Sequence, residues 1–199
     1  GEDCAIVTDA GMPAISDPGQ DLVHLCHLQG IPVVSVPGPV AFATALAVSG
    51  MESGRFTFEG FLSVNKKSRR DHLEELKDEK RTMIFYEAPH KFINTIGDLH
   101  RVLGDREIAI VRELTKAHEQ VVRTTLAQAE KDYTENKIKG EIVLIVAGKK
   151  AEPTDAITFD QAVEQARALV EKGASVNAAA KEIAAVTPYK KGDLYKALL

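Results

Sequence analysis

The sequence predicts an α/β protein with two α/β domains, the first with a parallel sheet and the second with a mixed one, followed by a small helical module. Short apolar runs that end in Gly, Pro or Asp recur along the chain and are typical of buried strands that lead into loops. They alternate with amphipathic stretches of helical period, which is the pattern of a sheet covered by helices. Only helical patterns follow after residue 150.

Residues 1–51 are predicted to be the C-terminal part of the first α/β domain. Strands are expected at 4–8 and 31–36, and helices between about 18 and 30 and about 42 and 50. The order β-α-β-α is typical of a parallel sheet. Because the chain starts directly in a core strand, we expect the natural protein to have a further N-terminal segment.

Residues 52–150 are predicted to form the second α/β domain. Its strands are expected at 56–61, 82–87, 107–112, 120–125 and 141–147, and its helices at 68–80, 90–102 and 126–133. This part has more strands per helix than the first, which favours a mixed sheet.

Residues 151–199 are predicted to form a helical tail. A linker is expected at 151–155, followed by helices at about 159–172, 175–186 and 192–199. The last two are similar to a helix-turn-helix, in which Lys181, Lys190, Lys191 and Lys196 would face RNA phosphates. A small packing module without an RNA role explains the pattern equally well.

The composition is that of a soluble globular protein, with 44% hydrophobic and 27% charged residues among 199. There is no run of apolar residues long enough to cross a membrane. Cys4 and Cys26 lack metal-ligand spacing, and no metal site is expected. Their apolar neighbours predict buried free thiols in a reducing compartment, hence a cytoplasmic location.

The charge pattern leaves a nucleic-acid partner open. A net charge of −4 does not favour RNA binding, but local patches matter more than the total. Basic clusters lie at 66–70, 137–139 and 190–191. Each is more often a solvated face than a binding site.

Two loops that follow predicted strands, 8–13 and 37–41, are candidate ligand sites. Ligands of open α/β sheets bind at the carboxyl ends of strands. Gly11 permits close approach of the backbone, Asp9 can accept hydrogen bonds, and the residues after Pro39 are small. Either loop alone is more often a plain turn.

Taken together, six strings of the sequence resemble one protein family. VTDAGMPAISDPGQDLV and VPGPVAFATALAVSG resemble the paired S-adenosylmethionine loops of the tetrapyrrole-methylase superfamily. FTFEGFL, RRDHLEELKDEKRTMIFYEAPHK, RELTKAHE and KGEIVLIVAG are similar to one branch of it, the bacterial enzymes that methylate the ribose 2′-oxygen of a cytidine in 16S ribosomal RNA. The order and spacing agree from Cys4 to Gly148.

The resemblance implies a homodimeric methyltransferase that acts on the small ribosomal subunit, with the methyl donor S-adenosylmethionine folded in the cleft between two α/β domains. By position, the donor pocket would be lined by Asp9, Ala10, Gly11, Val40, Ala41, Tyr86, Glu87, Ile142 and Val143. Met12 departs from the family pattern, in which Thr is commoner at this position. A glycine-containing loop of the expected N-terminal segment would complete the site, so this chain alone is expected to bind the donor weakly or not at all.

Ribose methylation benefits from a general base or a nearby cation, because a ribose hydroxyl is a weak nucleophile. The segment 112–119 carries such groups at the end of a predicted strand. Arg112 and Lys116 would stabilise charge or hold phosphate, and Glu113 or Glu119 would orient or deprotonate the hydroxyl. A salt-bridged loop without a catalytic role is the alternative. His90 is a second candidate, as an RNA contact or base.

Two other functions remain open at the level of sequence. The runner-up is a methylase of a small tetrapyrrole, against which FYEAPHK and RELTKAHE argue. The other is a non-catalytic RNA-binding protein. An NAD-dependent dehydrogenase is set aside, because the sequence has no glycine-rich dinucleotide fingerprint.

Overall fold

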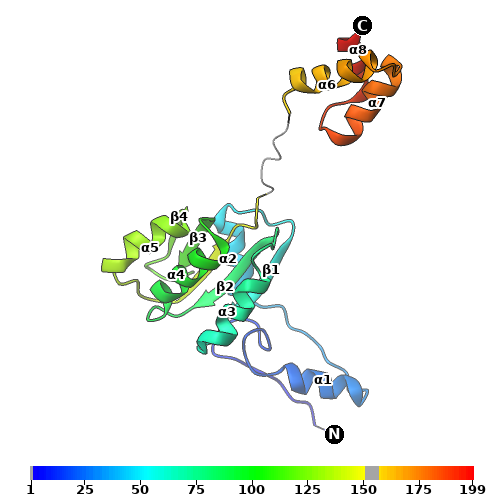
Figure 1. The fold of residues 1–199 in the computed structure, drawn as a ribbon. Coiled ribbons are helices and arrows are strands. Elements are labelled where there is room, and N and C mark those ends of the chain that lie inside the picture. Colours follow the sequence, from blue (N-terminus) through cyan, green and yellow to red (C-terminus); the bar gives the residue numbers. More distant parts are fainter. Residues whose placement is uncertain (1, 151–156) are drawn as a thin grey trace. The chain divides into compact units, whose positions relative to one another are not determined.

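The computed structural model describes residues 2–150 and 157–199. The chain divides into two compact units, Gly1–Lys150 and Ala151–Leu199 (Figure 1). The linker predicted at 151–155 lies outside the described residues. None of the helices in the described part is both long and apolar enough to cross a membrane.

The first unit is built on a five-stranded mixed sheet of order β1-β2-β5-β3-β4. The strands are β1 Phe56–Phe61, β2 Thr82–Glu87, β3 Glu107–Arg112, β4 Gln120–Thr125 and β5 Ile142–Val146. Only β1 and β2 are parallel, and every other neighbouring pair is antiparallel. The predicted mixed sheet and its five strands are therefore confirmed, with β5 one residue shorter at each end.

Three helices cover one face of this sheet (Figure 1). They are α3 Lys66–Glu75, α4 Phe92–Leu103 and α5 Leu126–Glu135. Successive residues of a strand point to opposite faces, so Met83 and Phe85 of β2 and Ile108 and Ile110 of β3 pack against these helices. This is the larger of the two cores in the unit.

A single helix, α2 Ala41–Ser49, covers the other face (Figure 1). Ala45 and Leu46 of α2 are buried against Ile84, Val143 and the other strand residues that point to this face. The helix ends at Gly50, whose φ of 67° is the left-handed conformation that commonly terminates helices. The helix predicted to end near residue 50 is thus confirmed.

The two strands predicted in the first forty residues are wrong. The structure has no strand between residues 2 and 40, where only α1 Gln20–Leu28 is regular. Val7, Val34 and Val36 are 82–85% exposed. A strand is stable only when its backbone groups pair with a neighbouring strand, and neither segment has such a partner here.

The two cysteines are free, as expected, but their predicted burial is wrong. Cys4 is exposed and Cys26 is partly buried. The apolar neighbours of Cys4 suggested burial, and these neighbours belong to the unpaired segment 4–8, where they remain accessible.

Arg106, which directly precedes β3, holds three connecting segments together through hydrogen bonds. Its guanidinium donates hydrogen bonds to the carbonyls of Lys77, Glu79, Leu103 and Ala147, at 2.5–3.3 Å. The residue is only 8% exposed. Buried carbonyls that lose their donors carry a desolvation cost.

We therefore expect Arg106→Met to lower the free energy of unfolding by about 3 kcal/mol, because several carbonyls lose a charged donor at once. The measurement is urea unfolding of the chain. Arg101→Met is the matched control, since its exposed pair with Asp98 at 2.8 Å is expected to contribute less than about 1 kcal/mol. Equal effects of the two variants would contradict this account.

The second unit is a three-helix module of α6 Phe159–Glu171, α7 Val176–Val186 and α8 Lys191–Leu198. A capping box between Thr158 and Gln161 begins α6, and Ser175 caps α7. The core contains Ala162, Ala166, Ala180, Ile183 and Leu194. The three predicted helices are confirmed, and Lys181, Lys190, Lys191 and Lys196 are all exposed.

Candidate functional site

Most of the predicted site residues lie at one edge of the sheet of the first unit. Tyr86, Val143 and Val111 stand side by side on β2, β5 and β3. Neighbouring strands are about 4.8 Å apart, so the end of β3 lies about 10 Å across the sheet from Tyr86. The connections that follow β2 and β3 leave from this edge.

The two predicted donor loops are brought together by the structure. The N–H of Met12 donates to the carbonyl of Pro39 at 3.0 Å. Gly11 has a φ of 77°, and a Cβ at this position would lie 2.9 Å from the same carbonyl oxygen. The close contact of the two loops therefore requires glycine at position 11. Asp9 and Ala10 are exposed on this loop.

Tyr86 connects the sheet to the beginning of α2. Its hydroxyl oxygen accepts a hydrogen bond from the N–H of Phe42, at 3.1 Å. Val40 and Ala41 directly precede Phe42. Three predicted donor-pocket residues, Tyr86, Val40 and Ala41, therefore lie together. Burial raises the pKa of the Tyr86 phenol, which stays protonated at neutral pH.

An aromatic cluster surrounds Tyr86, and sequence reasoning missed it. The rings of Phe58 and Phe61 lie 5.0 and 5.5 Å from the Tyr86 ring, and Phe58 stacks on Phe42 at 4.5 Å. Phe61 is 57% exposed, so the cluster is open to solvent on one side. The alternation of Phe56 and Phe58 with Thr57 and Glu59 in β1 was the available signal.

Glu87 and Ile142 lie on the opposite face of the sheet from Tyr86 and Val143. Glu87 is buried, and its carboxylate accepts hydrogen bonds from the N–H of Ala88, at 2.7 Å, and from the hydroxyl of Thr95. Ile142 is buried in the core under α3, α4 and α5. The side chain of Glu87 thus fixes the β2–α4 connection, in which His90 is exposed.

The loop after β3 is held by an ion-pair network. Glu113 Oε1 accepts hydrogen bonds from the N–H of Glu141 at 2.9 Å and from Lys116 Nζ at 3.0 Å. Lys116 Nζ also lies 3.1 Å from Glu141 Oε2. Glu113 and Thr115 have φ of 50° and 63°. Such backbone strain is concentrated at functional sites.

Hydrogen bonds set the ionisation of this pair. The N–H of Glu141 and the ammonium of Lys116 hold the pKa of Glu113 below its usual range, and the two carboxylates raise the pKa of Lys116. Both groups are therefore charged at neutral pH. The stabilisation from Glu113 is fully present above its unfolded-state pKa of about 4.3 and is lost as pH falls through the lowered value.

Leu114 determines the direction of this loop. Its side chain packs against the core beneath α2, to which Tyr86 also belongs. Leu114 itself therefore lies on the face of the sheet that carries Tyr86. Arg112 does not: it lies on the other face, where its Nε donates to Gln120 Oε1 at 2.8 Å.

Gly140 is required beside Glu113. Its φ is 88°, and a Cβ there would lie 2.4 Å from Glu113 Oε1. We expect Gly140→Ala to destabilise the first unit by about 1–3 kcal/mol and to displace the Glu113 carboxylate, because the residue is strained and sterically blocked. Urea unfolding measures the loss, and an amide shift of Glu141 in NMR spectra measures the displacement.

The control is Gly54→Ala, because nothing lies within 4 Å of a Cβ at that exposed position. We expect less than about 0.5 kcal/mol there. A Gly140→Ala protein with wild-type stability and an unshifted Glu141 amide would refute the steric argument.

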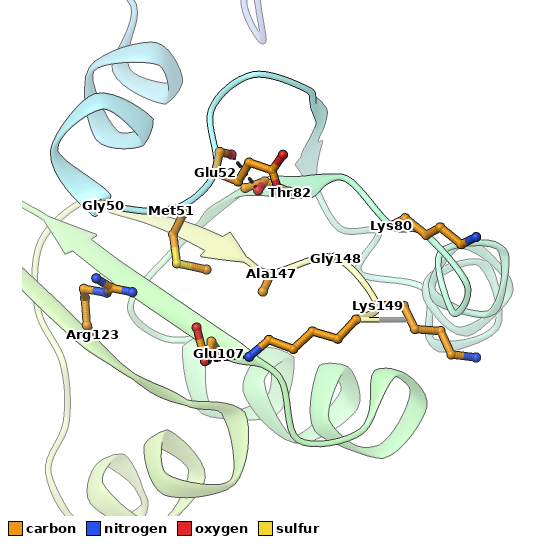
Figure 2. Close-up of a pocket in the computed structure, with 11 residues that line it drawn as sticks. Gly50, Met51, Glu52, Lys80, Thr82, Glu107, Arg123, Ala147, Gly148 and Lys149 are labelled. Atoms are coloured by element: carbon orange, nitrogen blue, oxygen red, sulfur yellow. Dashed lines mark hydrogen bonds and ion pairs between the residues drawn. The ribbon is translucent and has the colours of Figure 1, made fainter. Parts of the chain in front are cut away.

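One cavity lies at the opposite edge of the sheet, away from these residues. It measures about 310 Å³ and is lined by Thr82, Glu107 and Ala147 at strand ends, together with Met51 and Arg123 (Figure 2). Lys149 and Lys150 beside it are ion-paired with Asp78 and Glu107 at 2.7 and 2.9 Å. The size of this cavity alone does not identify it as the functional site. The strained residues Glu113 and Thr115 lie at the other edge of the sheet.

Comparison with known proteins settles the family. Residues 1–130 match the family model described as Tetrapyrrole (Corrin/Porphyrin) Methylases. The chain belongs to the tetrapyrrole methylase family. Within the described residues, no cluster of three His, Cys, Asp or Glu side chains suitable for a metal ion is found.

Several relatives of this tetrapyrrole methylase carry the name ribosomal RNA small subunit methyltransferase I. The protein from Synechocystis is 42% identical over 98% of this chain and 71% of its own length. Those from Haemophilus influenzae and Escherichia coli O157:H7 are each 44% identical over 98% of this chain, and over 70% and 68% of their own lengths.

Solved structures show the same fold. The cobalamin biosynthetic enzyme cobalt precorrin-4 methyltransferase is similar with a TM-score of 0.52 and 18% identity, over 69% of this chain and 61% of that chain. Uroporphyrin-III C-methyl transferase from Thermus thermophilus, complexed with S-adenyl homocysteine, has a TM-score of 0.50 and 17% identity, over 69% and 62%.

Proposed function

We propose that this tetrapyrrole methylase transfers a methyl group from S-adenosylmethionine to the 2′-oxygen of a cytidine ribose in 16S ribosomal RNA. The observation that carries the proposal is the identity of 42–44% over nearly the whole chain to proteins named ribosomal RNA small subunit methyltransferase I. The small-tetrapyrrole alternative has only a likeness of fold at 17–18% identity.

The paired loops and the start of α2 form the proposed donor site. Asp9, Ala10 and Gly11 are exposed beside Pro39, and Ala41 opens a helix whose first N–H groups have no partner within the helix. Such groups suit the carboxylate of an amino acid ligand. Tyr86, Val40 and Val143 provide the apolar side, whereas Glu87 and Ile142 act by shaping the strand ends.

S-adenosylmethionine supplies a methyl group on a sulfonium, which is a good leaving group. With the donor bound, the ribose oxygen would bond to this carbon as the carbon–sulfur bond breaks and S-adenosylhomocysteine leaves, and a carboxylate of the 113–119 loop would take the hydroxyl proton. Lys116 stabilises the negative charge that develops on the oxygen. Glu113 holds Lys116, and Glu119, whose Oε2 accepts the N–H of Thr115 at 2.6 Å, is the second carboxylate.

We further propose that the protein is a cytoplasmic homodimer bound to the small ribosomal subunit. Leu22, Leu25 and Leu28 on α1 are 50–69% exposed, and a dimer contact would bury this apolar surface. The exposed lysines of the tail supply additional contacts to RNA phosphates. Light scattering gives the oligomeric state, and a monomer at micromolar concentration would refute the dimer.

The function is tested by transfer of labelled methyl from S-adenosylmethionine to small ribosomal subunits that lack the modification, with protein expressed from the complete open reading frame. We expect label in 16S RNA and none in uroporphyrinogen III. Label in the tetrapyrrole alone would favour the runner-up. Absence of donor binding would favour a non-catalytic RNA-binding protein.

A further inference from the structure

We propose that a second cavity, between the end of β3 and the α5–β5 connection, binds a backbone phosphate of the RNA strand. This inference rests on the proposed function and adds a substrate-positioning site to it. The cavity measures about 250 Å³. Its polar lining consists of three cations, two amides and a phenol, namely Arg112, Lys137, Lys139, Gln120, Asn136 and Tyr133.

The charge of this lining is the first argument. No carboxylate lines the cavity, although the whole chain has a net charge of −4. Within the described residues, Arg112, Lys137 and Lys139 form no ion pair within 4 Å. Three cations without an ion pair around one hollow attract an anion, whereas the cavity of about 310 Å³ contains Glu52, Glu107 and ion-paired lysines.

The rigidity of Arg112 is the second argument. Its Nε donates to Gln120 Oε1 at 2.8 Å, and a terminal nitrogen donates to the Lys139 carbonyl at 3.0 Å. These bonds fix the plane of the guanidinium and leave further N–H groups for a ligand. A fixed guanidinium fork matches two oxygens of a phosphate.

The segment that carries both lysines is also held in place. Lys139 is bound through its carbonyl to Arg112, and Glu141 is bound through its N–H and carbonyl to Glu113. Lys137 and Lys139 therefore project from a short connection that is anchored on both sides. Little ordering remains to be done when an anion binds, which favours affinity.

The size and the neutral groups favour one backbone phosphate rather than a whole nucleotide. Ligand pockets for larger molecules usually exceed about 300 Å³. Tyr133 packs edge-on against Phe92, with ring centroids 5.1 Å apart, and burial raises the pKa of its hydroxyl, which stays a hydrogen-bond donor. Contacts of this kind position an RNA strand without recognising its base sequence.

The location links this cavity to methyl transfer. Arg112 ends β3 and directly precedes Glu113, at the same edge of the sheet at which β2 ends after Tyr86 and Glu87. A phosphate held on the face of the sheet that α3, α4 and α5 cover would place the adjoining ribose near the loop that carries Lys116. Arg112, a candidate for catalysis at the level of sequence, thereby becomes a positioning residue.

The test compares two double variants of the complete protein, Lys137→Gln with Lys139→Gln and, as the charge-matched control, Lys66→Gln with Lys67→Gln on α3. The probe is a short fluorescent single-stranded RNA of mixed sequence. Loss of the contacts to this one phosphate is expected to weaken binding about fivefold at about 0.1 M salt and to reduce the salt slope by about 0.7. The control is expected to bind RNA within about twofold of the wild type, and both variants are expected to keep wild-type affinity for S-adenosylmethionine.

Unchanged RNA binding by the Lys137 and Lys139 variant would overturn the inference, and so would equal losses of RNA affinity in both variants. A third contrary result would be that inorganic phosphate occupies this cavity in the wild-type protein without weakening its binding of RNA. Failure of the proposed function is a separate result. It would show as no methyl transfer by the wild-type protein, whatever the variants do to RNA binding.

Discussion

Replacing Lys116 by methionine is expected to slow methyl transfer about 100- to 1,000-fold, the usual effect of removing one group that stabilises charge in a transition state. Its ammonium lies 3.0 and 3.1 Å from two carboxylates, in the loop whose Leu114 packs against the same core as Tyr86. In the proposed mechanism, the negative charge that develops on the ribose oxygen would lose the cation that stabilises it. Single-turnover transfer to small ribosomal subunits at saturating donor measures the effect.

Lys131→Met is the matched control, because Lys131 is an exposed lysine on α5. We expect its rate within about twofold of the wild type. Unfolding midpoints of both variants show that the fold is kept, since Lys116 is 46% exposed. A Lys116→Met enzyme with the wild-type rate would remove Lys116 from the mechanism and leave the network as a structural device.

Replacing Phe85 by alanine is expected to lower the free energy of unfolding by about 3–5 kcal/mol, the usual range for a buried Phe. Phe85 is fully buried in β2, between its parallel neighbour β1 and its antiparallel neighbour β5. Truncation leaves a cavity beneath α3, α4 and α5, where the larger core lies. Urea unfolding followed by circular dichroism measures the change.

Phe61→Ala provides the comparison within the same sheet. Phe61 ends the edge strand β1 and is 57% exposed, so little apolar surface returns to water. We expect a loss below about 1 kcal/mol. Similar losses for the two phenylalanines would contradict the placement of the core.

The second half of the α/β unit was predictable because its strands are locally marked. β2, β3 and β5 contain continuous apolar runs, because their successive residues meet two cores, one on each face of the sheet. The segments 4–8 and 31–36 are equally apolar but form no strand. Pairing depends on a neighbour, and local sequence does not encode the presence of that neighbour.

The sequence period already places neighbouring predicted site residues on opposite faces of the sheet. Tyr86 and Glu87 are adjacent on one strand, so they had to face opposite sides, and the same period separates Arg112 from Val111. The predicted donor pocket included both Tyr86 and Glu87, and the predicted catalytic loop included Arg112, without regard to this alternation. Two features join segments that are distant in the sequence, namely the contact between Gly11 and Pro39 and the cavity at Lys137. Local sequence patterns do not show which distant segments meet, so neither feature was predicted.

The most direct test of the proposed function is the identity of the methylated nucleoside. Unmodified small ribosomal subunits are treated with the complete protein and labelled S-adenosylmethionine, and the 16S RNA is digested to nucleosides for mass spectrometry. The account predicts 2′-O-methylcytidine as the labelled product. Label on a base, or RNA without label from a protein that binds the donor, would contradict it.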